Sequence, residues 1–327
     1  MSDVAKLAGV SHQTVSRVLN TPEAVRESTR ERVVEAMTTL GYRPNLAARA
    51  LASSKSQLLG IMSAGEARFG PTHAIHGVEQ AARLADYLTT HLPATNPAEA
   101  EEATQHLLGA GVGGIVVIAP THQLADQITA HRRNTPVVLL AAGAPVSEGV
   151  SVVSVNQELG ARLAVRHLAK LGHPLIHHIS GPPRWFDAHT RVMGWRTECE
   201  ALGVEHGLLV EGGWDAADGF AATNTILASG APLGAIFAAN DLLALGAIRA
   251  LRKRGLSVPE DVSVVGFDDS EGADFYVPSL TTVRQPFALV GRLAIEVLLR
   301  MIDGEPASSS SVEPELVVRE STTPARG

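Results

Sequence analysis

Apolar residues follow two alternating patterns from residue 58 onward. Short continuous apolar runs are separated by longer segments in which apolar residues recur every three or four positions. Continuous runs of about four to eight residues are typical of buried strands, and the longer spacing is typical of amphipathic helices. The predicted strands are LLGIMSA, GGIVVIAP, PVVLLAA, SVVSVN, LIHHISG, HGLLVEGG, GAIFAAN and DVSVVGF, and HAIHGVEQAARLADYL is a predicted helix. The alternation predicts an α/β fold with doubly wound parallel sheets.

Two subdomains are predicted within this α/β region, because about ten strands are too many for one ordinary sheet. The change falls near Val155 and Asn156. LTTVRQ is predicted to return to the first sheet, PELVVRES to join the second, and the serine run at 308–311 to form a surface loop. The first subdomain then comprises about 57–155 and 284–312, and the second about 156–283 and 313–327.

Residues 1–44 show the pattern of three short helices. Ser2 or Asp3 can cap the first helix, and Ser11 can cap the second after the turn at Gly9. The third is predicted to begin at Ser28 with an S-x-x-E capping box and to end at Gly41. The residues predicted to face inward are Val4, Leu7, Ala8, Val15, Val18, Leu19, Val33, Met37 and Leu40.

The second of these helices carries hydrogen-bonding side chains on its outer face, namely His12, Gln13, Ser16, Arg17 and Asn20. Gln can pair with adenine and Arg with guanine in the major groove of DNA. The spacing alone also fits a small helical bundle with a polar face and no nucleic acid.

Charge is distributed unevenly along the chain. Residues 1–57 contain eight Lys and Arg and five Asp and Glu, a net charge of +3, whereas the remainder contains nineteen and twenty-nine, a net charge of −10. A basic head on an acidic body predicts that only the head meets phosphate.

Residues 45–56 form a segment of marginal helical character. Residues 46–52 are good helix formers, but a helix shorter than about twelve residues is unstable alone in water. We therefore expect it to be coil until something supports it. An ordinary linker between domains is the alternative, and the serines at 53, 54 and 56 fit it.

Several polar and aromatic residues stand just past predicted strands, where open α/β sheets bind ligands. They are Trp185, Arg191, Trp214, Asn240, Asp241, Asp268 and Asp269. Donors, acceptors and aromatic rings together suit a sugar. As alternatives, Asp241 is the expected N-cap of the following helix, at most one of Asp268 and Asp269 is expected to face a cleft, and both tryptophans could simply cover the core.

Other chemistry is missing from the sequence. It has no zinc, calcium, phosphate-loop or nucleophile-elbow motif, so we expect no metal, no cofactor and no enzymatic activity. The single cysteine, Cys199, is expected to be a small core residue. No signal peptide or membrane-length apolar run is present, which predicts a cytoplasmic protein without membrane association.

The first fifty residues carry a specific sequence motif. DVAKLAGVSHQTVSRVLN followed by TRERVVEAMTTLGYRPNLAARAL resembles the headpiece of the LacI/GalR family of transcriptional regulators. The resemblance implies an all-α helix-turn-helix (1–44), a hinge (45–56) and an effector-binding and dimerisation domain of periplasmic-binding-protein type (57–327). It also implies that His12, Gln13 and Arg17 enter the major groove, while Thr14, Ser16 and Asn20 contact phosphates or support the helix. Leu51 falls at the family's minor-groove wedge, with Ala48 and Arg49 nearby.

Residues 181–287 resemble the lactose-repressor-like branch of the family, as does Phe69-Gly70-Pro71. The implied effector-binding residues are Phe69, Arg191, Trp214, Asn240, Asp268, Gln285 and Phe287, to which we add Trp185. The chain departs from the family pattern in three places, one of which is Trp185, where many relatives carry a small residue. It lacks the N-P-F-F loop after the first strand, and Ala141-Ala142-Gly143 replaces the acid common after PVVLL. The further tryptophan, Trp185, predicts a disaccharide or β-glycoside as effector.

The resemblance implies a repressor that binds double-stranded operator DNA and is released by a sugar. We expect a homodimer, because the sequence shows no C-terminal leucine heptad. A sugar sensor of the solute-binding type without a DNA role is the main alternative, and an α/β sugar enzyme is a weaker one.

Overall fold

The computed structural model describes residues 1–20, 22–42, 56–64 and 68–325. The chain divides into two compact units, Met1–Gln57 and Leu58–Gly327. No helix within the described ranges is long and apolar enough to cross a membrane.

The first unit is a three-helix headpiece around a small apolar core. Its elements are α1 (Ser2–Ala8), α2 (His12–Asn20), η1 (Pro22–Ala24) and α3 (Glu27–Thr39). The core comprises Val4, Ala5, Ala8, Val15, Val18, Val33 and Ala36. Ser11 caps α2, since its Oγ accepts a hydrogen bond of 3.1 Å from the Thr14 N–H.

Three details of the headpiece prediction are wrong. Leu7 and Leu40 are 54% and 45% exposed, and alanines take the places in the core that these leucines were expected to fill. The third helix begins at Glu27, so Ser28 lies inside it and forms no capping box. Met1 precedes α1, and no side chain caps that helix.

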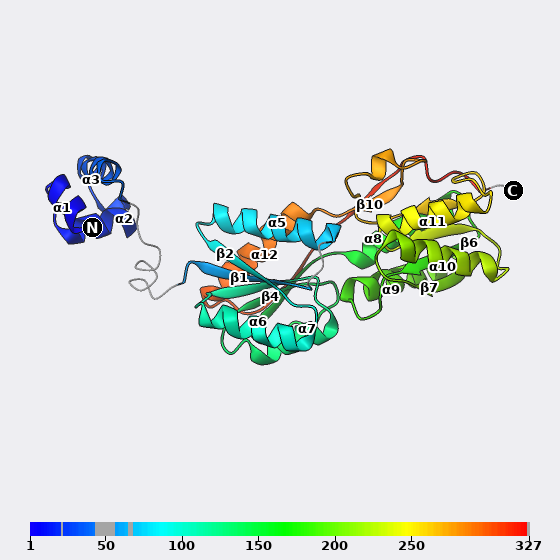
Figure 1. The fold of residues 1–327 in the computed structure, drawn as a ribbon, viewed down its shortest axis with the longest axis horizontal. Helices are drawn as coiled ribbons and strands as arrows, with labels where there is room; N and C mark the ends of the chain where they lie inside the picture. The colour runs from blue at the N-terminus through cyan, green and yellow to red at the C-terminus, as the bar shows by residue number, and fades with distance from the viewer. Residues whose placement is uncertain (21, 43–55, 65–67, 326–327) are drawn as a thin grey trace. The chain divides into compact units, whose positions relative to one another are not determined.

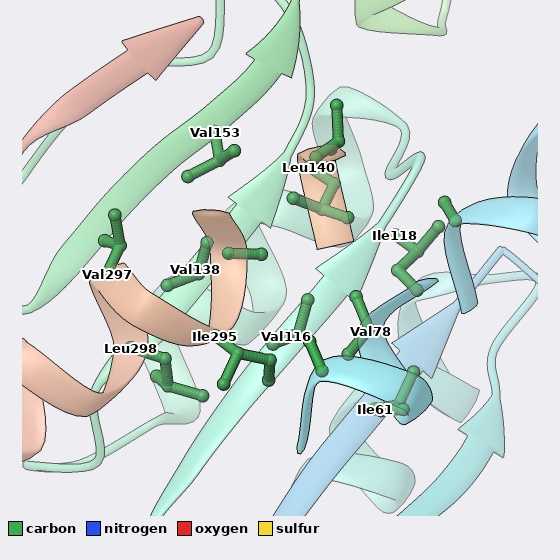
Figure 2. Packing of buried hydrophobic residues seen from close by; sticks show 14 of the residues in the cluster. Ile61, Val78, Val116, Ile118, Val138, Leu140, Val153, Ile295, Val297 and Leu298 are labelled. Carbon is green, nitrogen blue, oxygen red and sulfur yellow. The ribbon is translucent and has the colours of Figure 1, made fainter. Parts of the chain in front are cut away.

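The second unit contains a six-stranded parallel sheet in the order β11-β5-β4-β3-β1-β2. Its strands are β1 (Leu58–Ser63), β2 (Leu88–Pro93), β3 (Gly114–Ile118), β4 (Val137–Leu140), β5 (Val150–Val155) and β11 (Ser309–Val312). Helices α5 (Phe69–Leu84) and α12 (Phe287–Ile302) cover one face, and α6 (Pro97–Gly109) and α7 (His122–His131) cover the other (Figure 1). Alternate strand residues enter the two cores because strand side chains point to opposite faces. Figure 2 shows Ile295, Val297 and Leu298 of α12 against the central strands.

A second parallel sheet follows in the order β7-β6-β8-β9. Its strands are β6 (Leu175–Ser180), β7 (Glu205–Glu211), β8 (Ala235–Ala238) and β9 (Ser263–Val265). Helices α8 (Gln157–Lys170) and α9 (Phe186–Leu202) pack on one face, and α10 (Ala216–Ala228) and α11 (Asp241–Lys253) on the other. Cys199 is fully buried on α9, as expected of a core residue.

The chain crosses between the two sheets three times: after β5, between β10 (Thr282–Arg284) and α12, and between β11 and β12 (Glu315–Val317). Strands β10 and β12 pair with each other in antiparallel fashion. A short 3-10 helix, η2 (Ala273–Phe275), precedes β10.

Three predictions for this unit are wrong. LTTVRQ does not return to the first sheet, because β10 pairs with β12, and Thr281 and Arg284 form bridges to residues 265 and 268 of the second subdomain. The serine run predicted as a loop supplies β11, the edge strand beside β5. Helix α5 begins at Phe69 and ends at Leu84, and Leu88 begins strand β2, which has no continuous apolar run to reveal it.

Candidate functional site

A cavity partly open to solvent lies where the strands of both sheets end, and its empty space, counted together with the solvent at its mouth, is about 930 Å³. Its wall contains all eight residues predicted to bind an effector: Phe69, Trp185, Arg191, Trp214, Asn240, Asp268, Gln285 and Phe287. Phe69 and Phe287 are the first residues of α5 and α12, and Arg191 lies on α9. The remaining residues stand just past the ends of strands or at a crossover.

Arg191 lies at the polar end of the cavity and is 4% exposed. Its Nε donates to Gln157 Oε1 over 2.8 Å, and its Nη1 donates to the Ala239 carbonyl. Its Nη2 lies 3.9 Å from Asp268 Oδ1, and the ring of Phe267 lies 3.9 Å from its Cζ. A planar guanidinium held this way presents fixed donors to a ligand.

Two glutamines connect Arg191 to Asp268 by a second route. Gln157 Nε2 donates to Gln285 Oε1 over 2.8 Å, and Gln285 Nε2 donates to Asp268 Oδ1 over 2.6 Å. Gln157 was missed by the sequence analysis. Its position one residue past Asn156, directly after β5, is the strand-end signal that could have identified it.

Asp187 is a second carboxylate of the cavity wall that the sequence analysis missed. It lies in the first turn of α9, and its Oδ1 accepts a hydrogen bond of 2.9 Å from the Ala142 N–H at the end of β4. Burial raises the pKa of Asp187, and the charge of Arg191 opposes that shift. The chain has no acid directly after β4, but the Asp187 carboxylate of the second subdomain lies next to Ala142 at that position.

Burial also raises the pKa of Asp268 to about 6, against the opposing charge of Arg191 and the hydrogen bond from Gln285. A carboxyl group with a raised pKa binds a proton more readily than an ordinary aspartate does. A ligand hydroxyl that donates to such a group would favour its ionised form.

Aromatic side chains form the apolar walls. The rings of Trp185 and Trp214 meet edge to face, with centroids 6.2 Å apart, and those of Phe69 and Phe287 meet at 6.1 Å. The Nε1 atoms of both tryptophans are buried and have no hydrogen-bond partner among the described residues. A buried N–H without a partner is costly, so each is a donor available to a ligand.

Asn240 has a structural role besides lining the cavity. Its Oδ1 accepts from the Leu243 N–H over 2.7 Å, and its Nδ2 donates to the Trp214 carbonyl over 3.0 Å. The prediction that Asp241 caps α11 is therefore wrong, because Asn240 is the N-cap. Asp241 is buried in the cavity wall, and burial together with the charge of Asp268 raises its pKa to about 7.

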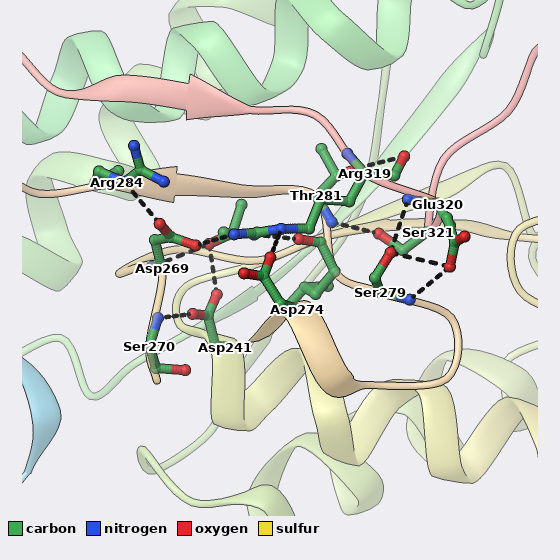
Figure 3. A network of polar contacts seen from close by, with 12 residues as sticks. Asp241, Asp269, Ser270, Asp274, Ser279, Thr281, Arg284, Arg319, Glu320 and Ser321 are labelled. Atoms are coloured by element: carbon green, nitrogen blue, oxygen red, sulfur yellow. Dashed lines mark hydrogen bonds and ion pairs between the residues drawn. The ribbon is translucent and has the colours of Figure 1, made fainter. Parts of the chain in front are cut away.

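Of the adjacent pair after β9, only Asp268 lines the cavity. Asp269 forms ion pairs of 2.7 Å with both Arg284 and Arg319 (Figure 3). The two aspartates have φ values of 109° and 52°, in the left-handed region that non-glycine residues rarely adopt.

The two subdomains touch each other around the cavity. Arg68 of the first subdomain pairs with Asp215 of the second over 3.2 Å. His122 Nδ1 lies 2.8 Å from the Arg184 carbonyl, and the contact of Asp187 with Ala142 joins the same two halves. These contacts hold the cleft in its present arrangement.

In the headpiece, His12, Gln13 and Arg17 are exposed on α2, and Thr14 and Ser16 are half-buried. Asn20 is the last residue of that helix. Ala48, Arg49 and Leu51 lie outside the described residues. Within the described parts of the chain, no group of three His, Cys, Asp or Glu could hold a metal ion.

A helical headpiece joined to a two-sheet domain with a cavity between its sheets defines the class of two-domain, ligand-responsive DNA-binding regulators. Residues 1–45 match the family described as bacterial regulatory proteins, lacI family, and residues 165–322 match the periplasmic binding protein-like domain. The chain belongs to the lacI family. It is a DNA-binding transcriptional regulator and not an enzyme.

Individual relatives agree with this assignment over almost the whole chain. The Lactose operon repressor of Escherichia coli (strain K12) is 36% identical over 98% of this chain and 89% of its own length. The lac repressor dimer bound to operator and the anti-inducer ONPF has a TM-score of 0.84 at 33% identity, covering 98% of each chain. The complex of the transcriptional regulator CelR with cellobiose has a TM-score of 0.76 at 32% identity, also covering 98% of each.

Proposed function

We propose that this chain is a repressor whose effector is a neutral sugar of more than one ring, a disaccharide or β-glycoside, bound in the cavity between the two sheets. The observation that carries the proposal is the convergence of eight predicted residues on one cavity with polar and aromatic walls. The proposed contacts are those of Phe69, Trp185, Arg191, Trp214, Asn240, Asp268, Gln285 and Phe287.

The chemistry of the walls matches a polyhydroxylated ligand. Each hydroxyl can both donate and accept, so it can accept from Arg191 and donate to Asp268. The indole N–H groups of Trp185 and Trp214 are further donors that a ligand oxygen would satisfy. A phosphorylated sugar would be opposed by Asp187 and Asp268, which stand beside one guanidinium.

The second tryptophan supports a ligand larger than one ring. Trp185 and Trp214 stand nearly perpendicular, with 89° between their planes. They therefore offer surfaces of different orientation to two linked rings. The cellobiose complex of CelR, a relative covering almost the whole chain, supports the same class of ligand.

The headpiece is proposed to read operator DNA as one half of a homodimer. His12, Gln13 and Arg17 would contact bases, and Thr14, Ser16 and Asn20 would contact phosphates or support α2. Ala48, Arg49 and Leu51 of the 45–56 hinge are proposed to meet the minor groove. The lac repressor dimer bound to operator supports the proposed homodimer on operator DNA. We place the protein in the cytoplasm, where its operator is.

Calorimetric titration of the full chain against monosaccharides, disaccharides, nucleobases and sugar phosphates tests the ligand class. We expect a disaccharide to bind and its affinity to fall in Trp185→Phe, which keeps an aromatic ring but removes the N–H. A loss of about fivefold to tenfold corresponds to one hydrogen bond. Binding of only nucleobases or sugar phosphates would overturn the proposal.

A further inference from the structure

The backbone beneath Asp268 has an unusual conformation. Asp268 and Asp269 both lie in the left-handed region, with φ values of 109° and 52°. Two such non-glycine residues in succession persist only where their surroundings hold them. Here the Asp268 N–H donates to the Val283 carbonyl over 2.8 Å, and the Ser270 N–H donates to Asp241 Oδ2 over 2.6 Å.

The side chain of Asp269 is held from two directions. Its Oδ2 accepts from Arg284 Nε and its Oδ1 from Arg319 Nη2, each over 2.7 Å. The Asp269 and Arg319 side chains are only 10% and 12% exposed. Figure 3 shows the Asp269 carboxylate between the two arginines.

Arg284 borders a segment that crosses between the sheets, and Arg319 lies just past the strand that pairs with β10. Arg284 ends β10 and immediately precedes Gln285, whose side chain donates to Asp268. Arg319 follows β12, and its Nη1 also donates to the Leu280 carbonyl over 2.8 Å. Asp269 therefore hydrogen-bonds to the crossover at 284–285 through Arg284, and Asp268 does so through Gln285.

We propose that Asp269, clamped by Arg319 and Arg284, is a positioning residue for the effector: it holds the left-handed turn that aims the Asp268 carboxylate into the cavity beside Arg191 and Gln285. The inference rests on the proposed function, because it assumes a ligand in this cavity. Asp269 lies outside the cavity wall, so it acts only through its neighbour.

Arg319 supplies a matched control for this role. Its Nε pairs with Asp274, whose side chain is 65% exposed and does not line the cavity. Asp269→Asn and Asp274→Asn each neutralise one carboxylate partner of the same arginine. Asparagine tolerates the left-handed backbone, so Asp269→Asn removes the charge without adding a steric conflict.

The experiment measures three quantities on full-length variants: disaccharide affinity by calorimetry, operator affinity without sugar, and operator affinity at saturating sugar. For Asp269→Asn we expect disaccharide affinity to fall at least tenfold, while operator affinity without sugar stays within threefold of the wild type. At saturating sugar, operator release should match the wild type, because positioning affects occupancy rather than the response. Asp274→Asn should change each quantity by less than threefold.

Equal loss of disaccharide affinity in both variants would assign Asp269 a merely structural role and overturn the inference. If Asp269→Asn binds the disaccharide as tightly as the wild type and releases operator to the same extent, the inference is overturned as well. If Asp269→Asn does not fold, Arg284→Gln replaces it, because Arg284 is 48% exposed and its loss leaves the Arg319 pair intact. Unchanged disaccharide affinity in Arg284→Gln would contradict the proposed positioning role of Asp269. Failure of the wild type to bind any sugar would instead overturn the proposed function.

Discussion

Arg191 is the residue around which the cavity is organised. Burial lowers its pKa, and the charges of the Asp268, Asp187 and Asp241 carboxyl groups oppose that shift. The three carboxyl groups thus stand around one buried guanidinium in the cavity wall. Burial is the main cause of the raised pKa values of all three acids.

Proton linkage gives the first prediction. A hydroxyl that donates to Asp268 favours its carboxylate form, so sugar binding should lower its pKa from about 6 and release protons. Affinity should then be highest above about pH 7 and fall as the pH drops through 6, by up to about tenfold per pH unit for one proton. Calorimetry in buffers of different ionisation enthalpy measures the release. Proton uptake at pH 6 would contradict this account.

DNA reading gives a second prediction at the same scale. Arg17 is exposed on α2, and a bidentate contact to guanine contributes about 1–3 kcal/mol of discrimination. Arg17→Ala should therefore weaken operator binding and relax the base preference at one operator position. Fluorescence anisotropy with single-base operator variants measures both effects, and Arg30→Ala on α3 is the control for lost positive charge. A uniform loss across all operator variants would reassign Arg17 to phosphate contact.

At the scale of elements, the buried strands could be predicted because both their faces are covered and their sequences are continuously apolar. Strand β2 (LTTHLP) and strand β11 (SSSV) lie at the edges of the first sheet, and their residues are half-buried or exposed, so no apolar run marks them. The pairing of β10 with β12 depends on a contact between distant segments, which local pattern does not specify.

The cavity residues could be predicted where a strand end or a resemblance marked them, as for Asp268 and Arg191. Asp187 could not, because an acid in the first turn of a helix is also favoured by the helix dipole alone. The left-handed backbone at Asp268 and Asp269 depends on Arg284 and Arg319, which lie at least fifteen residues away in sequence. In the headpiece, hydrophobicity favoured Leu7 and Leu40, but alanines fit the close approach of short helices.

Close packing of α5 against α12 gives an element-scale prediction. A Cβ on Gly291 would lie 2.3 Å from the Gly77 carbonyl carbon, so the helices touch through their backbones. The same helices begin at Phe69 and Phe287 of the cavity wall. Gly291→Ala should destabilise the protein by about 1–3 kcal/mol through overpacking and weaken sugar binding.

Gly109→Ala is the matched control, since nothing lies within 4 Å of its added Cβ. It should be neutral or stabilising by up to about 1 kcal/mol, because alanine loses less backbone entropy in a helix. Urea unfolding compares the two variants. A Gly291→Ala protein as stable as the wild type would show that the helices can separate freely.

At the scale of the whole molecule, two of the three crossovers supply residues to the cavity wall, so a ligand there would contact segments that join the two sheets. Gln157 and Gln285 follow two of the crossovers and hydrogen-bond to each other. The contacts of Arg68 with Asp215 and of Asp187 with Ala142 hold the cleft from either side. A ligand can change how the two subdomains meet only if it binds one arrangement of the subdomains more tightly than another.

Dependence of the headpiece on the rest of the chain gives a whole-molecule prediction. A fragment of residues 1–52 should bind operator far more weakly than the full chain, because it lacks the dimerisation domain that would set two recognition helices one DNA turn apart. The comparison is made by gel shift at equal salt, since phosphate contacts make affinity strongly salt-dependent. Equal affinity would show that the headpiece acts alone.

The central claim is that occupancy of the cavity controls DNA binding. The most direct test is the operator affinity of the full chain, measured by anisotropy at fixed salt with and without a saturating disaccharide that calorimetry shows to bind. The account predicts that the sugar lowers operator affinity at least tenfold in the wild type and has no effect in Arg191→Met, which loses the guanidinium. An operator affinity unchanged by bound sugar would contradict it.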